Sequence, residues 1–126
     1  MNCMTLREIC ETLAISRRAI QGYEKAGLVV ATGRNKYGHL LYDDAAKSRI
    51  EKIKFYQQLG FTIKEITIII DAPNVVIKEA LERQVQKLRK KKTEIDELIE
   101  KANQMIVRLS NEDNHDGRRI ETNENM

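Results

Sequence analysis

Apolar and polar positions near the start of the chain repeat with the spacing of two short helices. Residues 5–8 form a capping box, in which a Thr oxygen and a Glu carboxylate can satisfy free backbone donors. Apolar positions at helical spacing then continue to about Leu13. Ser16 is a good N-cap for a second helix over residues 17–26, and Gly27 is suited to ending it. Two short helices joined by a tight turn predict a helix-turn-helix.

The next segment has a different pattern, with two short β-prone runs at residues 28–31 and 40–42. They flank a polar stretch that contains glycine, which predicts a small β-hairpin, or wing. The acidic pair at 43–44 suits the start of a third helix, because the helix dipole favours negative charge there. A second capping box at residues 62–65 predicts a fourth helix, which ends at residues 71–73.

Residues 74–109 contain neither Gly nor Pro, which predicts one long helix. With Leu81 at an a position, seven of the nine core heptad positions are apolar over four heptads, as is typical of a coiled coil. The two polar d positions, Gln84 and Lys91, weaken pairing in the first half and favour an antiparallel arrangement or contact with another head. Such a stripe needs a partner, and the simplest is a second copy of the chain. The expected dimerisation residues are Leu81, Leu88, Ile95, Leu98, Ala102, Met105 and Leu109.

The expected fold is mainly α: a winged helix-turn-helix head over residues 1–73, followed by a long antiparallel coiled-coil dimerisation helix over 74–109. Composition agrees, since 33% charged residues and no Trp suit exposed helices better than a large core. The tail 110–126 has 2 Lys and Arg against 5 Asp and Glu, and we expect this acidic segment to be disordered.

Charge and cysteine content narrow the function classes. Residues 1–70 carry 11 Lys and Arg against 7 Asp and Glu, which suits a nucleic-acid partner, although ordinary solvated surface explains the charge alone equally well. Cys3 and Cys10 are too few and too badly spaced for a disulfide framework or a metal cluster, and Cys10 is expected to serve packing. No signal peptide or membrane-length apolar run is visible. We therefore expect a cytoplasmic protein without a cofactor, metal or membrane partner, and no catalytic constellation indicates an enzyme.

The second helix is the expected recognition helix. If Ile20 is buried, Arg17, Arg18 and Gln21 lie on the outward face. Arg can bond guanine and Gln can bond adenine in bidentate fashion in the major groove. Cations in the first turn of a helix oppose its dipole, and a phosphate or base edge would remove that conflict. The alternative is a solvated basic helix.

The loop between the two β-prone runs is the second candidate contact. Arg34, Lys36, Tyr37 and His39 provide two cations, a phenol and an imidazole, with no acidic residue among them. Such groups suit phosphate or minor-groove contacts, which position a protein on DNA without specifying sequence. The alternative is a flexible basic loop that has no partner.

Four segments of the head carry a resemblance to a known family: Thr5-Leu6-Arg7-Glu8-Ile9-Cys10, Ile15-Ser16-Arg17-Arg18-Ala19-Ile20, Tyr23-Glu24-Lys25-Ala26-Gly27-Leu28 and Leu59-Gly60-Phe61-Thr62-Ile63-Lys64-Glu65-Ile66. Through them, the stretch from residue 4 to residue 72 resembles the DNA-binding head of the MerR family of transcriptional regulators. The resemblance implies a homodimer on double-stranded DNA at a near-palindromic promoter operator, distortion of that DNA, and RNA polymerase as a promoter partner. It also implies a short form without a C-terminal effector domain, in which the long helix is the antiparallel dimerisation helix.

By position, the resemblance assigns Arg18 to the recognition helix and Tyr23 and Tyr42 to the neighbourhood of the DNA backbone. Two departures concern the residues with which that family usually contacts the phosphates of the DNA backbone. Gln-Gly-Tyr-Glu at 21–24 replaces the usual Arg-Tyr-Tyr-Glu, and the wing lacks the usual arginine after Gly38. Arg34 and Lys36 are expected to supply part of the missing charge. The full set of expected DNA-binding residues is Thr5, Ser16, Arg17, Arg18, Gln21, Tyr23, Arg34, Lys36, Tyr37, His39 and Tyr42.

Two other functions fit parts of this pattern. An architectural or excisionase-like DNA-bending protein would share the head, although a long dimerisation helix argues against it. A coiled-coil adaptor that binds only proteins would share the long helix. The sequence-specific regulator remains the leading hypothesis, because it alone uses the basic helix, the basic wing and the dimer helix together.

Overall fold

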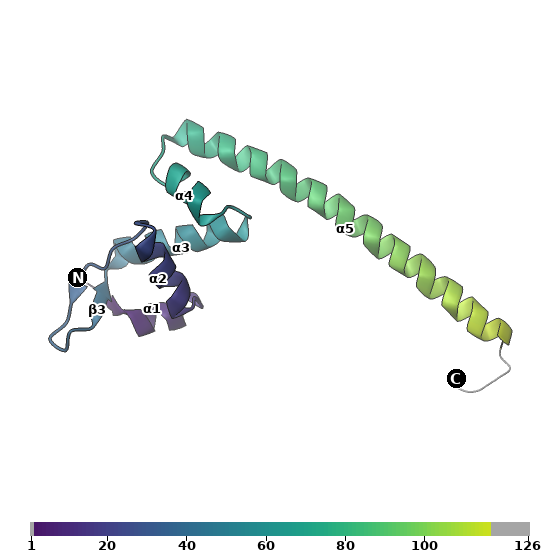
Figure 1. The fold of residues 1–126 in the computed structure, drawn as a ribbon, viewed down its shortest axis with the longest axis horizontal. Helices are drawn as coiled ribbons and strands as arrows, with labels where there is room; N and C mark the ends of the chain where they lie inside the picture. The colour runs from purple at the N-terminus through teal and green to yellow at the C-terminus, as the bar shows by residue number, and fades with distance from the viewer. Residues whose placement is uncertain (1, 117–126) are drawn as a thin grey trace. The chain divides into compact units, whose positions relative to one another are not determined.

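The computed structural model describes residues 2–116. It divides into two compact units, one ending at Gln84 and the other beginning at Val85. Figure 1 shows the order of the elements. They are β1 (Met4–Thr5), α1 (Leu6–Leu13), α2 (Arg17–Lys25), β2 (Gly33–Arg34), β3 (Leu40–Tyr42), α3 (Asp44–Gln58), α4 (Ile63–Ile69) and α5 (Asn74–Asp116).

The predicted helix-turn-helix is confirmed as α1 and α2, and its capping residues act as expected. The hydroxyl of Thr5 accepts from the backbone N–H of Glu8 at 3.2 Å, and the Glu8 carboxylate accepts from the Thr5 N–H at 2.9 Å. The Ser16 hydroxyl accepts from the N–H of Ala19 at 3.0 Å. Both helices therefore begin where a side chain satisfies an otherwise free backbone donor.

The wing is confirmed, but one of its predicted strands is wrong. β3 pairs antiparallel with β2, with Gly33 opposite Leu41, and not with residues 28–31. Leu28 and Val29 are both buried, so this run enters the core as irregular chain, whereas a surface strand would alternate buried and exposed side chains. β3 also pairs with β1 on its other side, which gives a three-stranded sheet in the order β1-β3-β2.

Isoleucine is the most frequent residue in the core of the head, and most of these isoleucines come from the helices. Tyr42 of β3 is buried among them. Thr62 caps α4 as predicted, and Asp43 is the N-cap of α3. The sheet covers little area, so the helices supply most of the apolar burial that stabilises the head. The fully buried isoleucines are Ile9, Ile20, Ile50, Ile53 and Ile66.

The first turns of α5 pack on the head. Ala80 is buried in the core, and Leu81 packs against it. Leu81, which was expected in the dimer seam, is thus only partly buried against its own head, and its place in a seam stays a prediction. The compact head accordingly extends to Gln84, past the expected boundary at residue 73.

α5 begins at residue 74 as predicted and continues to Asp116, past the expected end at Leu109. The expected disorder is therefore wrong for residues 110–116, which are polar but contain no Gly or Pro to end a helix. Residues 117–126 of the expected acidic tail lie outside the described residues. Within the described part of the chain, no helix combines the length and the apolar character needed to cross a membrane.

Candidate nucleic-acid interface

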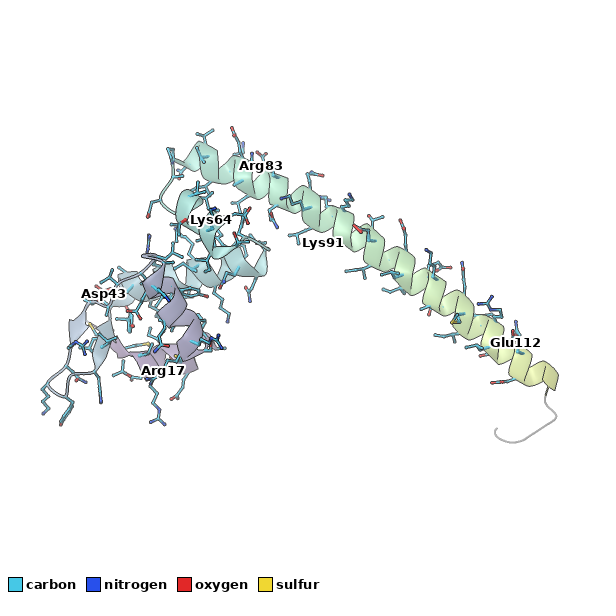
Figure 2. The ribbon with its side chains drawn as sticks, viewed as in Figure 1. Arg17, Asp43, Lys64, Arg83, Lys91 and Glu112 are labelled. Carbon is cyan, nitrogen blue, oxygen red and sulfur yellow. The ribbon has the colours of Figure 1, made fainter. Side chains whose placement is uncertain are left out.

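α2 presents a basic face to solvent, as the sequence predicts. Ile20 and Tyr23 are buried, whereas Arg17, Arg18 and Gln21 are exposed. Figure 2 labels Arg17 on the outer surface of the head. Two guanidinium groups and one carboxamide therefore point away from the core, and these are the side-chain types that recognise base edges in a major groove.

Two buried tyrosines hold α2 in place from beneath. The Tyr23 hydroxyl donates to Oε1 of Gln57 on α3 at 2.5 Å. The Tyr42 hydroxyl donates to Oε1 of Glu24 at 3.0 Å, which joins the wing strand to α2. Burial raises the pKa of Tyr23, and burial together with the bond to Glu24 raises the pKa of Tyr42, so both hydroxyls remain donors at neutral pH.

This arrangement corrects the expected positions of Tyr23 and Tyr42. Their side chains are only 2% and 1% exposed, so they support the interface from inside the head and are not surface contacts. Sequence alone could not separate the two cases, because a tyrosine hydroxyl can serve a phosphate or a protein acceptor equally well. Thr5 and Ser16, also expected at the interface, use their hydroxyls as helix caps; Ser16 is exposed and Thr5 is half-buried.

The wing tip is closed by hydrogen bonds within the loop. The Asn35 side-chain oxygen accepts from the backbone N–H groups of Tyr37 and His39 at 2.9 and 3.0 Å. Nη1 of Arg34 donates to the carbonyl of Gly38 at 2.6 Å. Gly38 has φ 83°, a left-handed conformation that glycine adopts without steric cost. Sequence reasoning missed Asn35, although an Asn in a glycine-bearing loop is a known turn signal.

The expected wing contacts are all exposed around this closed tip. Tyr37 is 71% exposed, and the Lys36 ammonium lies 5.2 Å from the centre of its ring. The rings of Tyr37 and His39 are 6.4 Å apart. The structure therefore groups three of the four predicted wing residues at the tip, while Arg34 stands at its base with one guanidinium N–H used internally.

Two further cations that sequence reasoning missed brace the head. Arg49 on α3 makes two bonds of 2.8 Å to the carboxylate oxygens of Asp71, and its Nε donates to the carbonyl of Leu28. The hydrogen bond to Arg49 lowers the pKa of Asp71. Nζ of Lys54 donates to the carbonyl of Leu13 at 2.7 Å, at the end of α1. These cations satisfy backbone carbonyls next to α1 and α2 and help to fix both helices.

The described residues hold no group of three or more His, Cys, Asp or Glu side chains placed to bind a metal ion. Cys3 and Cys10 are free and partly buried, and Cys10 packs against the core as expected. The chemistry of this surface is therefore that of guanidinium, ammonium, amide and aromatic groups, which suits binding to a polyanion.

Comparison with known sequences also supports a DNA-binding role for this surface. The family described as "MerR HTH family regulatory protein" matches residues 4–72, and the family described as "MerR, DNA binding" matches residues 47–111. The HTH-type transcriptional activator mta of Bacillus subtilis is 30% identical over 102 residues, covering 81% of this chain and 40% of that protein. The chain thus spans about two fifths of the length of this relative.

Solved structures show the same fold. The N-terminal part of the Bacillus subtilis multidrug transporter activator, MtaN, superimposes with a TM-score of 0.64 at 30% identity, covering 82% of this chain and 97% of that chain. HiNmlR, a MerR family regulator lacking the sensor domain and bound to promoter DNA, gives a TM-score of 0.64 at 21% identity. That match covers 79% of this chain and 80% of the other, and at this identity it supports the fold alone.

Proposed function

The chain belongs to the MerR family of helix-turn-helix regulators, and on this premise we propose that it works in the cytoplasm as a homodimeric transcriptional regulator. In this proposal the dimer binds a near-palindromic operator within a promoter, distorts the DNA there, and acts on RNA polymerase at that promoter.

The observation that carries the proposal is the fixed, outward basic face of α2 beside the closed wing. Arg17, Arg18 and Gln21 are exposed on a helix that partly buried hydrogen bonds hold at its opposite face. This is the arrangement by which a recognition helix enters a major groove while neighbouring elements contact the backbone. In the same proposal Arg34 and Lys36 supply phosphate contacts from the wing.

The dimer is proposed from the exposed apolar side chains of α5. Ile95, Leu98, Met105 and Leu109 are 56%, 64%, 53% and 51% exposed in the single chain. They recur at heptad spacing along the helix, and an apolar stripe of this kind is stabilised when a second helix covers it. Since Leu81 packs on its own head, the proposed seam runs from Leu88 to Leu109.

The heptads favour one antiparallel register. With Ile95 opposite the partner's Leu98, Leu88 falls opposite the partner's Met105, and Lys91 falls opposite the small side chain of the partner's Ala102. Each pair occurs twice, because a two-fold interface is self-complementary. At the flanks Glu94 then lies beside the partner's Lys101, an opposite-charge pair of the kind that sets coiled-coil orientation.

Shifting this pairing by one heptad in either direction brings like charges together. One shift puts Lys91 opposite the partner's Ile95 and Glu94 beside the partner's Glu94. The other puts Leu88 opposite the partner's Glu112 and Lys101 beside the partner's Lys101. Both shifts leave like charges side by side at the edge of the seam, which is destabilising. The favoured register also holds Lys91 in the seam, but there it faces the small side chain of the partner's Ala102.

The proposal is tested by selecting preferred duplexes from a random library with the full chain, followed by footprinting and electrophoresis of circularly permuted fragments. A near-palindromic site, a two-half-site footprint and a bend are expected. Arg17→Ala with Arg18→Ala should abolish sequence preference while sedimentation still shows a dimer. A monomer in solution with no preferred duplex would reject the proposal. Preference for a site outside promoters would favour the architectural DNA-bending function instead.

A further inference from the structure

Asn35 makes more hydrogen bonds within the wing tip than its exposed neighbours do. Its side-chain oxygen accepts from the N–H groups of Tyr37 and His39. Its backbone N–H donates to the carbonyl of His39 at 3.0 Å, and its carbonyl accepts from the N–H of Gly38 at 3.0 Å. Asn35 is half-buried, whereas residues 36–39 are exposed.

These four bonds close the loop on itself. The two backbone bonds end the ladder between β2 and β3, and the two side-chain bonds satisfy N–H groups that have no place in that ladder. Asn and Asp side chains favour such turns because their short acceptor reaches the backbone two residues ahead. An Ala at this position would leave the backbone bonds but remove the acceptor shared by Tyr37 and His39.

We propose that Asn35 is a positioning residue for DNA binding, one that pre-forms the wing tip so that Lys36, Tyr37 and His39 contact the duplex without first becoming ordered. The inference rests on the proposed DNA-binding function. Asn35 itself is half-buried and its side-chain oxygen is already engaged, so it acts through the three exposed side chains.

The expected benefit is a smaller loss of conformational freedom on binding. A flexible loop must give up backbone freedom when it contacts a ligand, whereas a loop already held by hydrogen bonds has lost most of it on folding. Loss of the Asn35 acceptor should therefore weaken affinity by roughly tenfold, the effect of ordering about one backbone residue. The number of phosphates contacted should not change, because no cation is removed.

The test compares Asn35→Ala with Lys36→Ala in the full chain, using a duplex selected from the random library. In Asn35→Ala, nitrogen-15 relaxation should show increased motion at the amides of Tyr37 and His39, with an unchanged melting temperature. Its dissociation constant should rise while the slope of log affinity against log salt stays the same. Lys36→Ala should keep the loop ordered and reduce that slope by about one phosphate contact. Asn35→Asp, which retains the acceptor, should restore the order of the loop.

Each outcome decides the matter. Amides that stay ordered in Asn35→Ala would overturn the proposed role, and so would a disordered loop that binds DNA as tightly as before. A reduced salt slope in Asn35→Ala would assign the loss to a phosphate contact and not to positioning. Failure of the unmodified chain to prefer any duplex would reject the proposed function itself and, with it, this role for Asn35, and the relaxation data would then show only whether Asn35 orders the free loop.

Discussion

The side-chain amide of Gln84 donates a hydrogen bond to the backbone carbonyl of Leu59 at 2.6 Å, and this bond ties α5 to the end of α3. Gln84 is only 7% exposed, although the heptad pattern places it at a polar position of the dimer seam. Leu59 is the C-cap of α3, where backbone carbonyls lack helical partners. Gln84, one of the two polar core positions of the heptad pattern, therefore stabilises the head of its own chain.

Replacing Gln84 with Leu should destabilise the head by roughly 1–3 kcal/mol, because the partly buried Leu59 carbonyl loses its partner. Urea unfolding followed by circular dichroism measures the change. The control is Gln86→Leu, two residues further along α5 and exposed, which should change stability little. Equal effects of the two substitutions would contradict this role of Gln84.

The same Gly-to-Ala substitution should have opposite effects at two positions. Gly60 has φ 107°, and a Cβ there would lie 2.6 Å from Nε2 of Gln84, so Gly60→Ala should destabilise by more than about 1 kcal/mol. Gly22 lies within α2 with open space around it, so Gly22→Ala should stabilise by roughly 0.5–1 kcal/mol. Thermal melts of both variants test the pair. A loss of stability in Gly22→Ala would contradict the open space around Gly22.

The ion pair between Arg49 and Asp71 predicts a loss of stability in acid. Its hydrogen bond lowers the pKa of Asp71 in the folded chain. The ion pair therefore stabilises the fold fully at any pH above the pKa of Asp71 in the unfolded chain, about 3.9. This stabilisation is lost as the pH falls through the lower pKa of Asp71 in the folded chain. Asp71→Asn should flatten the plot of unfolding free energy against pH in this acidic range. Glu51→Gln, at an exposed position of α3, should leave the loss of stability in acid unchanged. Parallel profiles for Asp71→Asn and the unmodified chain would contradict it.

The proposed register predicts which cysteines can form a covalent dimer. In a background of Cys3→Ser and Cys10→Ala, the pair Leu88→Cys with Met105→Cys should cross-link on mild oxidation, as seen on non-reducing gels. The pair Leu88→Cys with Leu98→Cys, which matches the neighbouring register, should not. Leu88→Cys alone should stay uncross-linked, because its two copies would lie about 25 Å apart along antiparallel helices at roughly 1.5 Å per residue. Efficient cross-linking of that single variant would indicate parallel helices and overturn the register.

Local signals predicted the elements of the head well. The capping residues Thr5, Ser16 and Thr62 determine helix starts through bonds to the next turn, so their effect is contained in a few adjacent residues. The outward face of α2 followed equally from the expected burial of Ile20. Such features depend only on residues a few positions apart, so they can be predicted from a single sequence.

Long-range pairings could not be predicted in the same way. The strand β1 exists because Met4 lies opposite Tyr42, and no local pattern marks a two-residue strand. The partners Gln57 and Glu24 of the buried tyrosines lie 34 and 18 residues from them in the sequence. The run at 28–31 has β propensity, but burial of both Leu28 and Val29 outweighs it.

The bond between Tyr42 and Glu24 has a consequence for how a duplex would be recognised. It joins the strand that carries the wing to the helix that carries Arg17 and Arg18, so these two parts cannot slide freely past each other. A bound duplex would then have to match the separation that the protein sets, and base sequences differ in the energy needed to widen or narrow a groove. We therefore expect discrimination by DNA stiffness at base pairs that no side chain touches.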